Sequence, residues 1–335
     1  MPLLKVENLT TSFTTPQGKV QAVRDVSFEL NEGEVLGIVG ESGSGKSQMM
    51  YTIMGLLAEN GVVESGKITF DGEDISLSGF PNKKEYENRM REIRGNRISM
   101  IFQDPMTFLN PVLKIETQLI EPLMNHTKMT KEEARERALE LMRLVGIPSP
   151  EKRIRQYPFE FSGGMRQRII IAIALTCNPK LIIADEPTTA LDVTIQAQVL
   201  ELIDKLRKET NTAVIMITHD LGVVAKLCDR VAIMYGGKIV ETGTDREIFY
   251  EPKHPYTQGL LQCVAKSNMD EMEEELKPIP GSPPDLLNPP KGCPFVDRCS
   301  RAMRVCKDYM PDPDSCSETH HFRCWLSDER AKGGK

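Results

Sequence analysis

The chain has 335 residues, of which 40% are hydrophobic and 27% are charged. This length and composition exclude a peptide-sized scaffold, a disordered chain and a collagen-like chain. The formal net charge of -6 argues against a global basic field, so we do not expect nucleic acid as a main partner. No apolar run approaches the roughly 20 residues that span a bilayer, and the N-terminus lacks the features of a secretory signal. We therefore expect a cytosolic chain that does not cross a membrane by itself.

Short apolar and β-branched runs predict strands at residues 5–9, 22–28 and 35–39. The third run is continuously apolar, as expected for a strand covered on both faces of a parallel α/β sheet. Similar buried runs recur at 181–184 and 213–217, each followed by polar residues. In parallel sheets the functional groups lie at the carboxyl ends of such strands, so we look for the chemistry there.

Helical periodicity is clearest at residues 131–144, where apolar side chains recur every three or four positions. We place a helical insert around residues 104–165.

The character of the sequence changes after residue 250. An acidic block at 270–275 is followed by six prolines between 278 and 290, which exclude a helix or a central strand and predict a stiff, extended connector. The predicted organisation is therefore an α/β domain at 1–250 and a C-terminal extension at 251–335.

A phosphate-binding loop is predicted at residues 40–47, which read Gly-Glu-Ser-Gly-Ser-Gly-Lys-Ser and match G-x-x-x-x-G-K-[ST]. The loop follows a buried strand and precedes an apolar run at 49–54 that can form a helix. Its backbone N–H groups can point at an anion, Lys46 can neutralise phosphate charge, and the Ser47 hydroxyl can bind Mg²⁺. The residues expected to bind nucleotide here are Ser42, Gly43, Ser44, Gly45, Lys46 and Ser47.

The strand at 181–184 is followed by Asp185 and Glu186. At a nucleoside triphosphate site, Asp185 would hold Mg²⁺ and Glu186 would orient or deprotonate the attacking water. Taken alone, the pair could equally be a solvated strand end.

Residues 161–168 read Phe-Ser-Gly-Gly-Met-Arg-Gln-Arg and resemble the signature of ATP-binding-cassette (ABC) ATPases, usually Leu-Ser-Gly-Gly-Gln. The family's other motifs follow in order: Gln103, a D-loop-like Thr-Ala-Leu-Asp ending at Asp192, and His219 in the place of the switch histidine. The resemblance implies a P-loop NTPase fold of the ABC nucleotide-binding type with a helical subdomain. It also implies ATP hydrolysis, with ATP and Mg²⁺ as cofactors.

Residue roles follow from the same resemblance. Gln103 would join Ser47 and Asp185 around Mg²⁺, sense the γ-phosphate and couple the site to a membrane partner. His219 would contact the γ-phosphate and hold the catalytic water with Glu186, although a single histidine after a strand is more often an ordinary half-buried residue. The resemblance also implies that Asp192 communicates across a dimer and that Phe13 stacks on adenine. The alternative for Phe13 is an ordinary core residue.

The signature supplies a second anion site, because Ser162 and the amides of Gly163 and Gly164 lie where a helix begins. One chain would then carry two half-sites, which implies a head-to-tail dimer with ATP between one subunit's loop and the other's signature. Phe161 and Met165 depart from the usual residues and suggest a non-identical ATPase partner. A homodimer is the alternative for the isolated chain.

Four segments of the tail indicate one branch of this family. The C-terminal extension of oligopeptide/dipeptide and nickel importer ATPases is resembled by residues 254–261 (His-Pro-Tyr-Thr-Gln-Gly-Leu-Leu), 279–284 (Ile-Pro-Gly-Ser-Pro-Pro), 292–295 (Gly-Cys-Pro-Phe) and 298–299 (Arg-Cys). This resemblance implies a peripheral subunit on the cytoplasmic face of the membrane that powers import of dipeptides or oligopeptides. Its partners would be two transmembrane permeases and, indirectly, an extracytoplasmic solute-binding protein.

Three other functions stay open at this point. Within the same branch the cargo could be nickel. From another class, the chain could be a soluble ABC ATPase acting mechanically on DNA or ribosomes, although such proteins usually carry tandem cassettes or a coiled-coil insert, and no sustained heptads are present. A redox regulator would use the cysteines described next.

Four cysteines of the tail have the spacing Cys293-x5-Cys299-x6-Cys306-x17-Cys324. Zinc knuckles use closer pairs, and the common ferredoxin spacings do not match. The family resemblance favours a [4Fe-4S] cluster with a structural role; zinc and reduced structural thiols are the alternatives. Cys316 could replace Cys324 as the fourth ligand. The remaining cysteines are expected to be small core residues: Cys177, Cys228 and Cys263.

Overall fold

The computed structural model describes residues 1–102, 108–188, 193–265 and 279–329. The chain divides into two compact units, each described by itself below. Unit 1 consists of Met1–Glu29, Leu36–Ser76 and Thr218–Lys335, and unit 2 of Leu30–Val35 and Leu77–Ile217.

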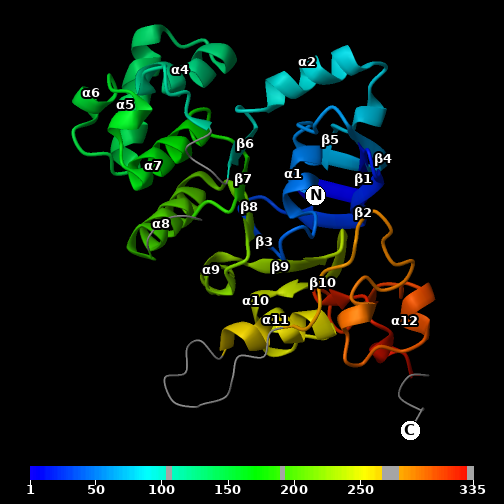
Figure 1. The fold of residues 1–335 in the computed structure, drawn as a ribbon. Coiled ribbons are helices and arrows are strands. Elements are labelled where there is room, and N and C mark those ends of the chain that lie inside the picture. The colour runs from blue at the N-terminus through cyan, green and yellow to red at the C-terminus, as the bar shows by residue number, and fades with distance from the viewer. Residues whose placement is uncertain (103–107, 189–192, 266–278, 330–335) are drawn as a thin grey trace. The chain divides into compact units, whose positions relative to one another are not determined.

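Unit 1 contains two sheets (Figure 1). The first is four-stranded, with the order β2-β1-β4-β5. The part of the second sheet that belongs to this unit has the strand order β11-β12-β10-β9-β3, and its strands β3 and β9 are parallel. The strands are β1 (Leu4–Thr15), β2 (Gly18–Leu30), β3 (Val35–Val39), β4 (Gly61–Phe70), β5 (Glu73–Asp74), β9 (Arg230–Tyr235), β10 (Lys238–Thr244), β11 (Asp314–Ser315) and β12 (His321–Phe322). The α-helices are α1 (Lys46–Ile53), α9 (Leu221–Leu227), α10 (Asp245–Tyr250), α11 (Pro255–Ala265) and α12 (Val305–Asp308).

The first three predicted strands are present in unit 1. The continuously apolar run at 35–39 forms β3, all five residues of which are buried. The runs at 5–9 and 22–28 form the central parts of β1 and β2, which are longer than predicted because the chain continues as a hairpin through residues 16–17. Burial on both faces explains why β3 has no polar residue, as a strand between covered faces requires.

Unit 2 combines a parallel strand group, in the order β8-β7-β6, with helices. The predicted strands at 181–184 and 213–217 lie within β7 and β8, and every residue of both is buried. The strands are β6 (Ile98–Ile101), β7 (Leu181–Asp185) and β8 (Ala213–Thr218). The α-helices are α2 (Lys83–Ile93), α4 (Ile115–His126), α5 (Lys131–Leu144), α6 (Pro150–Arg153), α7 (Gly163–Ala174) and α8 (Val193–Thr210).

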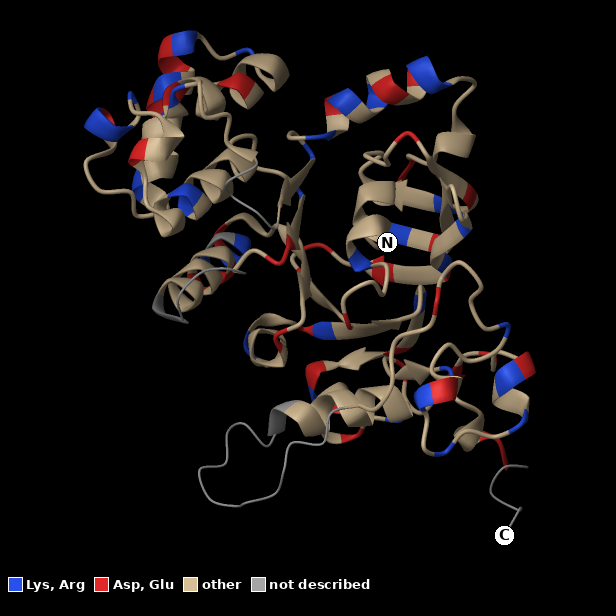
Figure 2. Ribbon diagram, viewed as in Figure 1, with Lys and Arg blue, Asp and Glu red and all other residues tan. Residues whose placement is uncertain are grey.

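Helix α5 has the bounds that its periodicity predicts. Thr130 caps it: its side chain accepts a hydrogen bond from the Glu133 N–H (3.3 Å), and the Glu133 carboxylate accepts one from the Thr130 N–H (2.7 Å). This reciprocal pair satisfies two N–H groups that the helix itself leaves unpaired. Lys and Arg lie among Asp and Glu on α2 and α5 (Figure 2), so oppositely charged side chains can pair along each helix, as Arg137 does with Glu140 at 3.3 Å.

The proline-rich segment at 279–290 contains neither helix nor strand, as predicted. It is not a free spacer, because it lies along β2: the Gln21 N–H donates to the Leu286 carbonyl (2.9 Å) and Arg24 Nη2 to the Pro290 carbonyl (2.7 Å). A segment that forms neither helix nor strand leaves its carbonyl groups available to such donors.

The end of the described tail returns to the second sheet of unit 1. Strand β12 pairs antiparallel with β10, with Glu241 opposite Phe322 and Thr242 opposite His321, and β11 pairs with β12. The tail therefore adds two short strands beyond β10. Across the described ranges of the chain, none of the helices is long and apolar enough to cross a bilayer.

Candidate functional site

The predicted phosphate-binding loop connects β3 to α1 in unit 1, and two of its glycines, Gly40 and Gly45, cannot be replaced without a clash. A Cβ on Gly40 would lie 2.1 Å from the Met234 carbonyl oxygen, and one on Gly45 would lie 2.1 Å from the Ala22 carbonyl oxygen. Gly43 and Gly45 also adopt φ angles of 76° and 99°, which side chains with a Cβ rarely adopt. The backbone is therefore packed closely on one side, whereas a Cβ on Gly43 would meet no atom within 4 Å.

Lys46 lies against the backbone of this loop. Its side chain is buried, and its Nζ donates hydrogen bonds to the carbonyl oxygens of Gly40 (2.7 Å) and Glu41 (2.9 Å). The first turn of α1 contains no acidic residue, so nothing there opposes the positive end of the helix dipole. A close-packed glycine backbone, a held ammonium group and a helix N-terminus together fit the phosphates of a nucleotide.

The other predicted residues of unit 1 are His219 and Phe13. The structure places His219 between β8 and α9 and exposed, so it is not the half-buried histidine of the alternative interpretation. Asp220 caps α9 beside it by accepting from the Gly222 N–H at 2.8 Å. Phe13 lies half-buried near the end of β1, paired with Gly61, where a Cβ would be 2.8 Å from its ring. Stacking of Phe13 on adenine stays a prediction.

Asp185 and Glu186 belong to unit 2. Asp185 ends β7 and is buried, at 1% exposure. Glu186 follows with φ of 45°, and its N–H donates to the Ile217 carbonyl on neighbouring β8 (2.9 Å). A left-handed conformation at a residue other than glycine is uncommon and is found preferentially at functional sites. The backbone thus holds the Glu186 carboxylate in a direction that a regular strand end would not give.

The signature segment begins α7, also in unit 2. Ser162 caps this helix and its Oγ accepts from the Met165 N–H (3.3 Å). A Cβ on Gly163 would meet nothing within 4 Å, so the backbone there is open. Phe161 stands where the usual signature has leucine, and its apolar side chain is buried, at 3% exposure. These features leave the helix N-terminus able to accept an anion.

Gln167 is a residue that the motif analysis missed. It is buried on α7, and its Nε2 donates to the carbonyl oxygen of Pro187 (2.6 Å), the residue after Glu186. The signature helix is therefore tied to the segment that carries the predicted catalytic carboxylate. In the sequence Gln167 stands between Arg166 and Arg168, so nothing there marked it as a buried residue.

Two predicted residues, Gln103 and Asp192, lie outside the described residues. Of the predicted Mg²⁺ ligands, Ser47 belongs to unit 1 and Asp185 to unit 2. Their joint role stays a prediction.

Comparison with known proteins decides the family. Residues 23–189 match the family described as ABC transporter, and residues 240–306 match the one described as oligopeptide/dipeptide transporter, C-terminal region. The dipeptide transport ATP-binding protein DppD of Bacillus subtilis (strain 168) is 54% identical over 331 residues, which cover 98% of this chain and 96% of that protein. The oligopeptide transport ATP-binding protein OppD of the same strain is 55% identical, with 97% and 88% covered. The chain belongs to the ABC transporter ATPases.

A solved structure agrees with this assignment. A dimeric ATP-binding cassette in a post-hydrolysis state, bound to ADP and Pi, is 29% identical with a TM-score of 0.63, covering 72% of this chain and 99% of that one. The predicted P-loop NTPase fold of the ABC type is therefore confirmed, as is the prediction that the chain is an ATPase.

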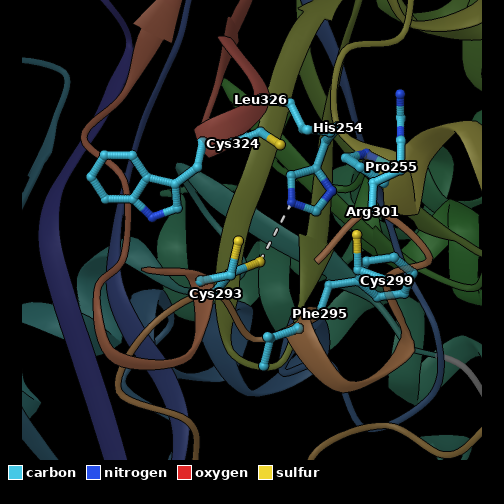
Figure 3. Close-up of a pocket in the computed structure, with 11 residues that line it drawn as sticks. His254, Pro255, Cys293, Phe295, Cys299, Arg301, Cys324 and Leu326 are labelled. Carbon is cyan, nitrogen blue, oxygen red and sulfur yellow. Dashed lines mark hydrogen bonds between the residues drawn. The ribbon is translucent and has the colours of Figure 1, made fainter. Parts of the chain in front are cut away.

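The predicted [4Fe-4S] cluster is wrong for this ABC ATPase. Cys293, Cys299, Cys306 and Cys324 do line one pocket of unit 1, together with His254 (Figure 3). Yet within the ranges that the structure describes, no group of three or more His, Cys, Asp or Glu side chains could hold a metal ion. Zinc in the same place has no support from the described residues either, and the relatives DppD and OppD are named as transport ATP-binding proteins.

Two physical properties of this pocket argue against the cluster that the cysteine spacing suggested. The cavity measures about 20 Å³, which is space for roughly one water molecule. Burial raises the pKa of the Cys293 thiol to about 12 and also raises the pKa values of Cys299 and Cys324, so these side chains are neutral thiols in the metal-free protein. Reduced thiols, the remaining alternative, agree with the 3.9 Å contact between Cys293 Sγ and His254 Nε2 (Figure 3).

The other cysteines have separate places. Cys316 is exposed, does not line this pocket and has its Sγ 3.3 Å from His320 Nδ1. Cys228 is a buried small residue, as predicted, and its Sγ would lie 2.8 Å from a Cβ on Gly37. Cys177 and Cys263 are only partly buried.

A buried polar cluster in unit 1 was not foreseen. Glu241 on β10 is 1% exposed, and its carboxylate accepts from the N–H groups of Lys253 (2.6 Å) and His254 (3.0 Å) and lies 2.8 Å from His320 Nε2. His320 belongs to the returning tail. A buried carboxylate with three partners satisfies the general requirement for buried charge and fixes the tail to β10.

Glu247 on α10 makes a second attachment, and it predicts a dependence of stability on pH. Burial opposes its ionisation, but hydrogen bonds from Ser317, Thr244 and Thr319 outweigh this and lower the pKa to about 2. The ionised Glu247 carboxylate therefore stabilises the folded state fully above its ordinary pKa of about 4.5. This stabilisation is lost as the pH falls from there towards 2.

We expect Glu247→Gln to lower the free energy of unfolding by about 1 to 2 kcal/mol at pH 7, because the charged acceptor is lost from a partly exposed site. Urea unfolding at pH 7 and at pH 3.5 measures this, and the difference from the parent chain should shrink at the lower pH. The control is Glu251→Gln, since Glu251 pairs only loosely at the surface with Lys253 (3.6 Å). A difference that grows on acidification would contradict the assignment.

Proposed function

We propose that the chain is the ATP-hydrolysing subunit of a membrane transporter that imports dipeptides or oligopeptides. The observation that carries the proposal is the combination, in one chain, of a phosphate loop with the required close-packed glycines and a C-terminal region of the oligopeptide/dipeptide transporter type. The names of DppD and OppD, more than half identical over nearly the whole chain, support peptide as the cargo.

The roles proposed for the residues follow the chemistry of phosphoryl transfer, in which positioning and charge neutralisation dominate. Backbone N–H groups of the loop and the Lys46 ammonium hold the phosphates of ATP. Bound Mg²⁺ supplies further neutralisation of phosphate charge. Glu186 orients the attacking water and His219 supports it. The remaining proposed contacts are Ser47, Gln103 and Asp185 for Mg²⁺, Phe13 for adenine, Ser162, Gly163 and Gly164 for a facing nucleotide, and Asp192 for communication between subunits.

We propose a head-to-tail pair of cassettes as the working state, with a non-identical ATPase as the partner. The dimeric form of the solved cassette supports pairing. Two transmembrane permeases would contact this pair at the cytoplasmic face of the membrane, and a solute-binding protein would act indirectly. The division at residue 250, with a helical subdomain at about 104–165, remains part of this proposal.

Purification of the full chain from membranes tests the proposal. It should retain two polytopic membrane proteins, and the assembly in vesicles should take up a labelled dipeptide or oligopeptide only with Mg-ATP inside the compartment that holds this chain. Lys46→Ala is the matched control, because it removes the phosphate-neutralising ammonium and should abolish uptake. Uptake of nickel in place of peptide would contradict the proposed cargo. Association with DNA or ribosomes instead of membrane proteins would contradict the proposal that the chain is part of a transporter.

A further inference from the structure

The second residue of the phosphate loop, Glu41, contacts the C-terminal tail, and both belong to unit 1. Arg298 Nη1 lies 2.7 Å from a carboxylate oxygen of Glu41. The Glu41 backbone N–H donates to the hydroxyl oxygen of Tyr256 at 3.0 Å. The tail therefore holds both the side chain and the backbone of one loop residue, across more than 200 positions of sequence.

Arg298 is itself held in a single orientation. Its side chain is 7% exposed, and its guanidinium also donates to Tyr235 Oη (3.0 Å) and to the carbonyl oxygens of Pro280 (2.9 Å) and Ile279 (3.1 Å). A planar group with donors in fixed directions, most of them satisfied, has little freedom to leave the Glu41 carboxylate. Such charge-assisted hydrogen bonds are among the strong ones in proteins.

Tyr256 has an equally fixed position. It is fully buried, its ring lies 4.4 Å from that of Tyr235 and 5.4 Å from that of Phe295 (centroid distances), and its backbone N–H donates to His254 Nδ1 (3.1 Å). Packed aromatic rings with defined geometry hold one another in place. The hydroxyl group therefore reaches Glu41 from a rigid support.

The consequence for the nucleotide is carried by the Glu41 carbonyl oxygen. That oxygen and the Gly40 carbonyl accept the two shorter of the described hydrogen bonds from Lys46 Nζ, at 2.9 and 2.7 Å, and Ser44 Oγ lies 3.5 Å from the same nitrogen. Fixing Glu41 thus fixes one of the acceptors that position the ammonium group, and it sets the path of the backbone into the glycines that follow. Neither Arg298 nor Tyr256 belongs to the motifs of the cassette.

We propose that Arg298 and Tyr256 are positioning residues of the nucleotide site: through Glu41 they hold the phosphate loop in its binding conformation. The tail is then part of the machinery that binds ATP, in addition to whatever partners it has. The loop holds phosphates in the ground state as well as during the reaction, so the loss of positioning should weaken ATP binding more than it slows turnover of bound ATP.

The test is equilibrium binding of ATP with Mg²⁺ to the full chain, together with KM and kcat for hydrolysis. We expect Arg298→Ala to raise the dissociation constant and KM about tenfold, the effect of losing one charge-assisted hydrogen bond, with kcat changed less than about threefold. Arg298→Lys should restore part of the affinity, since it keeps the charge opposite Glu41. Tyr256→Phe, which removes only the hydroxyl group, should raise KM in the same direction.

Two controls separate positioning from general damage. Arg301→Ala removes a nearby tail arginine whose guanidinium hydrogen-bonds to Gln258, and it should leave KM unchanged. In a chain that already carries Glu41→Ala, adding Arg298→Ala should have no further effect on ATP binding, because both changes break the same contact.

The inference rests on the ATP use proposed above, and the parent chain distinguishes the two failures. If the parent chain binds no ATP, the proposed function and the inference both fail. If the parent binds ATP and the Arg298→Ala and Tyr256→Phe variants bind equally well, the inference alone is overturned. If Arg298→Ala does not fold, the ATP affinities of Arg298→Lys and Tyr256→Phe are compared with that of the parent in the same way. Equal effects of Arg301→Ala and Arg298→Ala on KM would also overturn the inference.

Discussion

Glu186→Gln should reduce ATP hydrolysis by two to four orders of magnitude while ATP remains bound. The substitution preserves the shape of the side chain, so the positive-φ backbone that directs it can stay as it is. It removes the carboxylate that is proposed to orient and deprotonate the attacking water, and general base catalysis contributes roughly 10² to 10⁴ in rate. Steady-state hydrolysis and nucleotide binding, both measured on the assembled transporter or on the purified chain, give the two quantities.

The control for this experiment is Glu140→Gln on α5, an exposed carboxylate that pairs at the surface with Arg137. It should leave hydrolysis within about twofold of the parent, since exposed ion pairs contribute little. Hydrolysis that survives in Glu186→Gln would mean that another group activates the water. Loss of ATP binding in the same variant would mean that Glu186 holds the nucleotide and has no separate role in the chemical step.

Glu241→Ala should lower the free energy of unfolding by about 3 to 5 kcal/mol, which is the usual result of removing one member of a buried charged cluster. Two backbone N–H groups, from Lys253 and His254, and the His320 ring would each lose their acceptor inside the protein. Chemical denaturation measures the loss. Limited proteolysis should show that cleavage after about residue 300 becomes faster, because His320 attaches the tail to β10.

The matched change is Glu251→Ala, which removes an exposed carboxylate a short way along the chain and should alter stability by less than about 0.5 kcal/mol. A small effect of Glu241→Ala, comparable with that of Glu251→Ala, would show that the buried cluster does not hold the tail in place.

The core strands could be predicted because their apolar runs, of four or five residues, are too short for a buried helix and are bounded by polar or turn residues. The run at 35–39 has five apolar residues between turn signals, and the structure gives β3 the same bounds. Helix α5 could be predicted for a local reason as well, since Thr130 and Glu133 form a capping pair that depends only on nearby residues. The family followed from the order of several short motifs, each with its own chemistry.

The contacts that join distant segments could not be predicted in the same way. Nothing in the local sequence of Glu41 indicates that Arg298 will reach it, and nothing near Glu241 indicates His320. The cysteines show the opposite failure: their spacing carried a cluster prediction, but spacing along the chain gives neither the room between side chains nor the depth of burial that decides thiol ionisation. Gln103 and Asp192 lie outside the described residues, so their roles remain predictions.

The pairing of β12 with β10 affects the behaviour of the molecule in solution as well as its stability. Without the returning tail, β10 would present a row of unpaired N–H and C=O groups along the border of a sheet, and such borders recruit strands from other molecules. We therefore expect a chain shortened before β11 to aggregate more readily than the full chain, even with its nucleotide loop intact, because β10 would lose its pairing at Glu241 and Thr242.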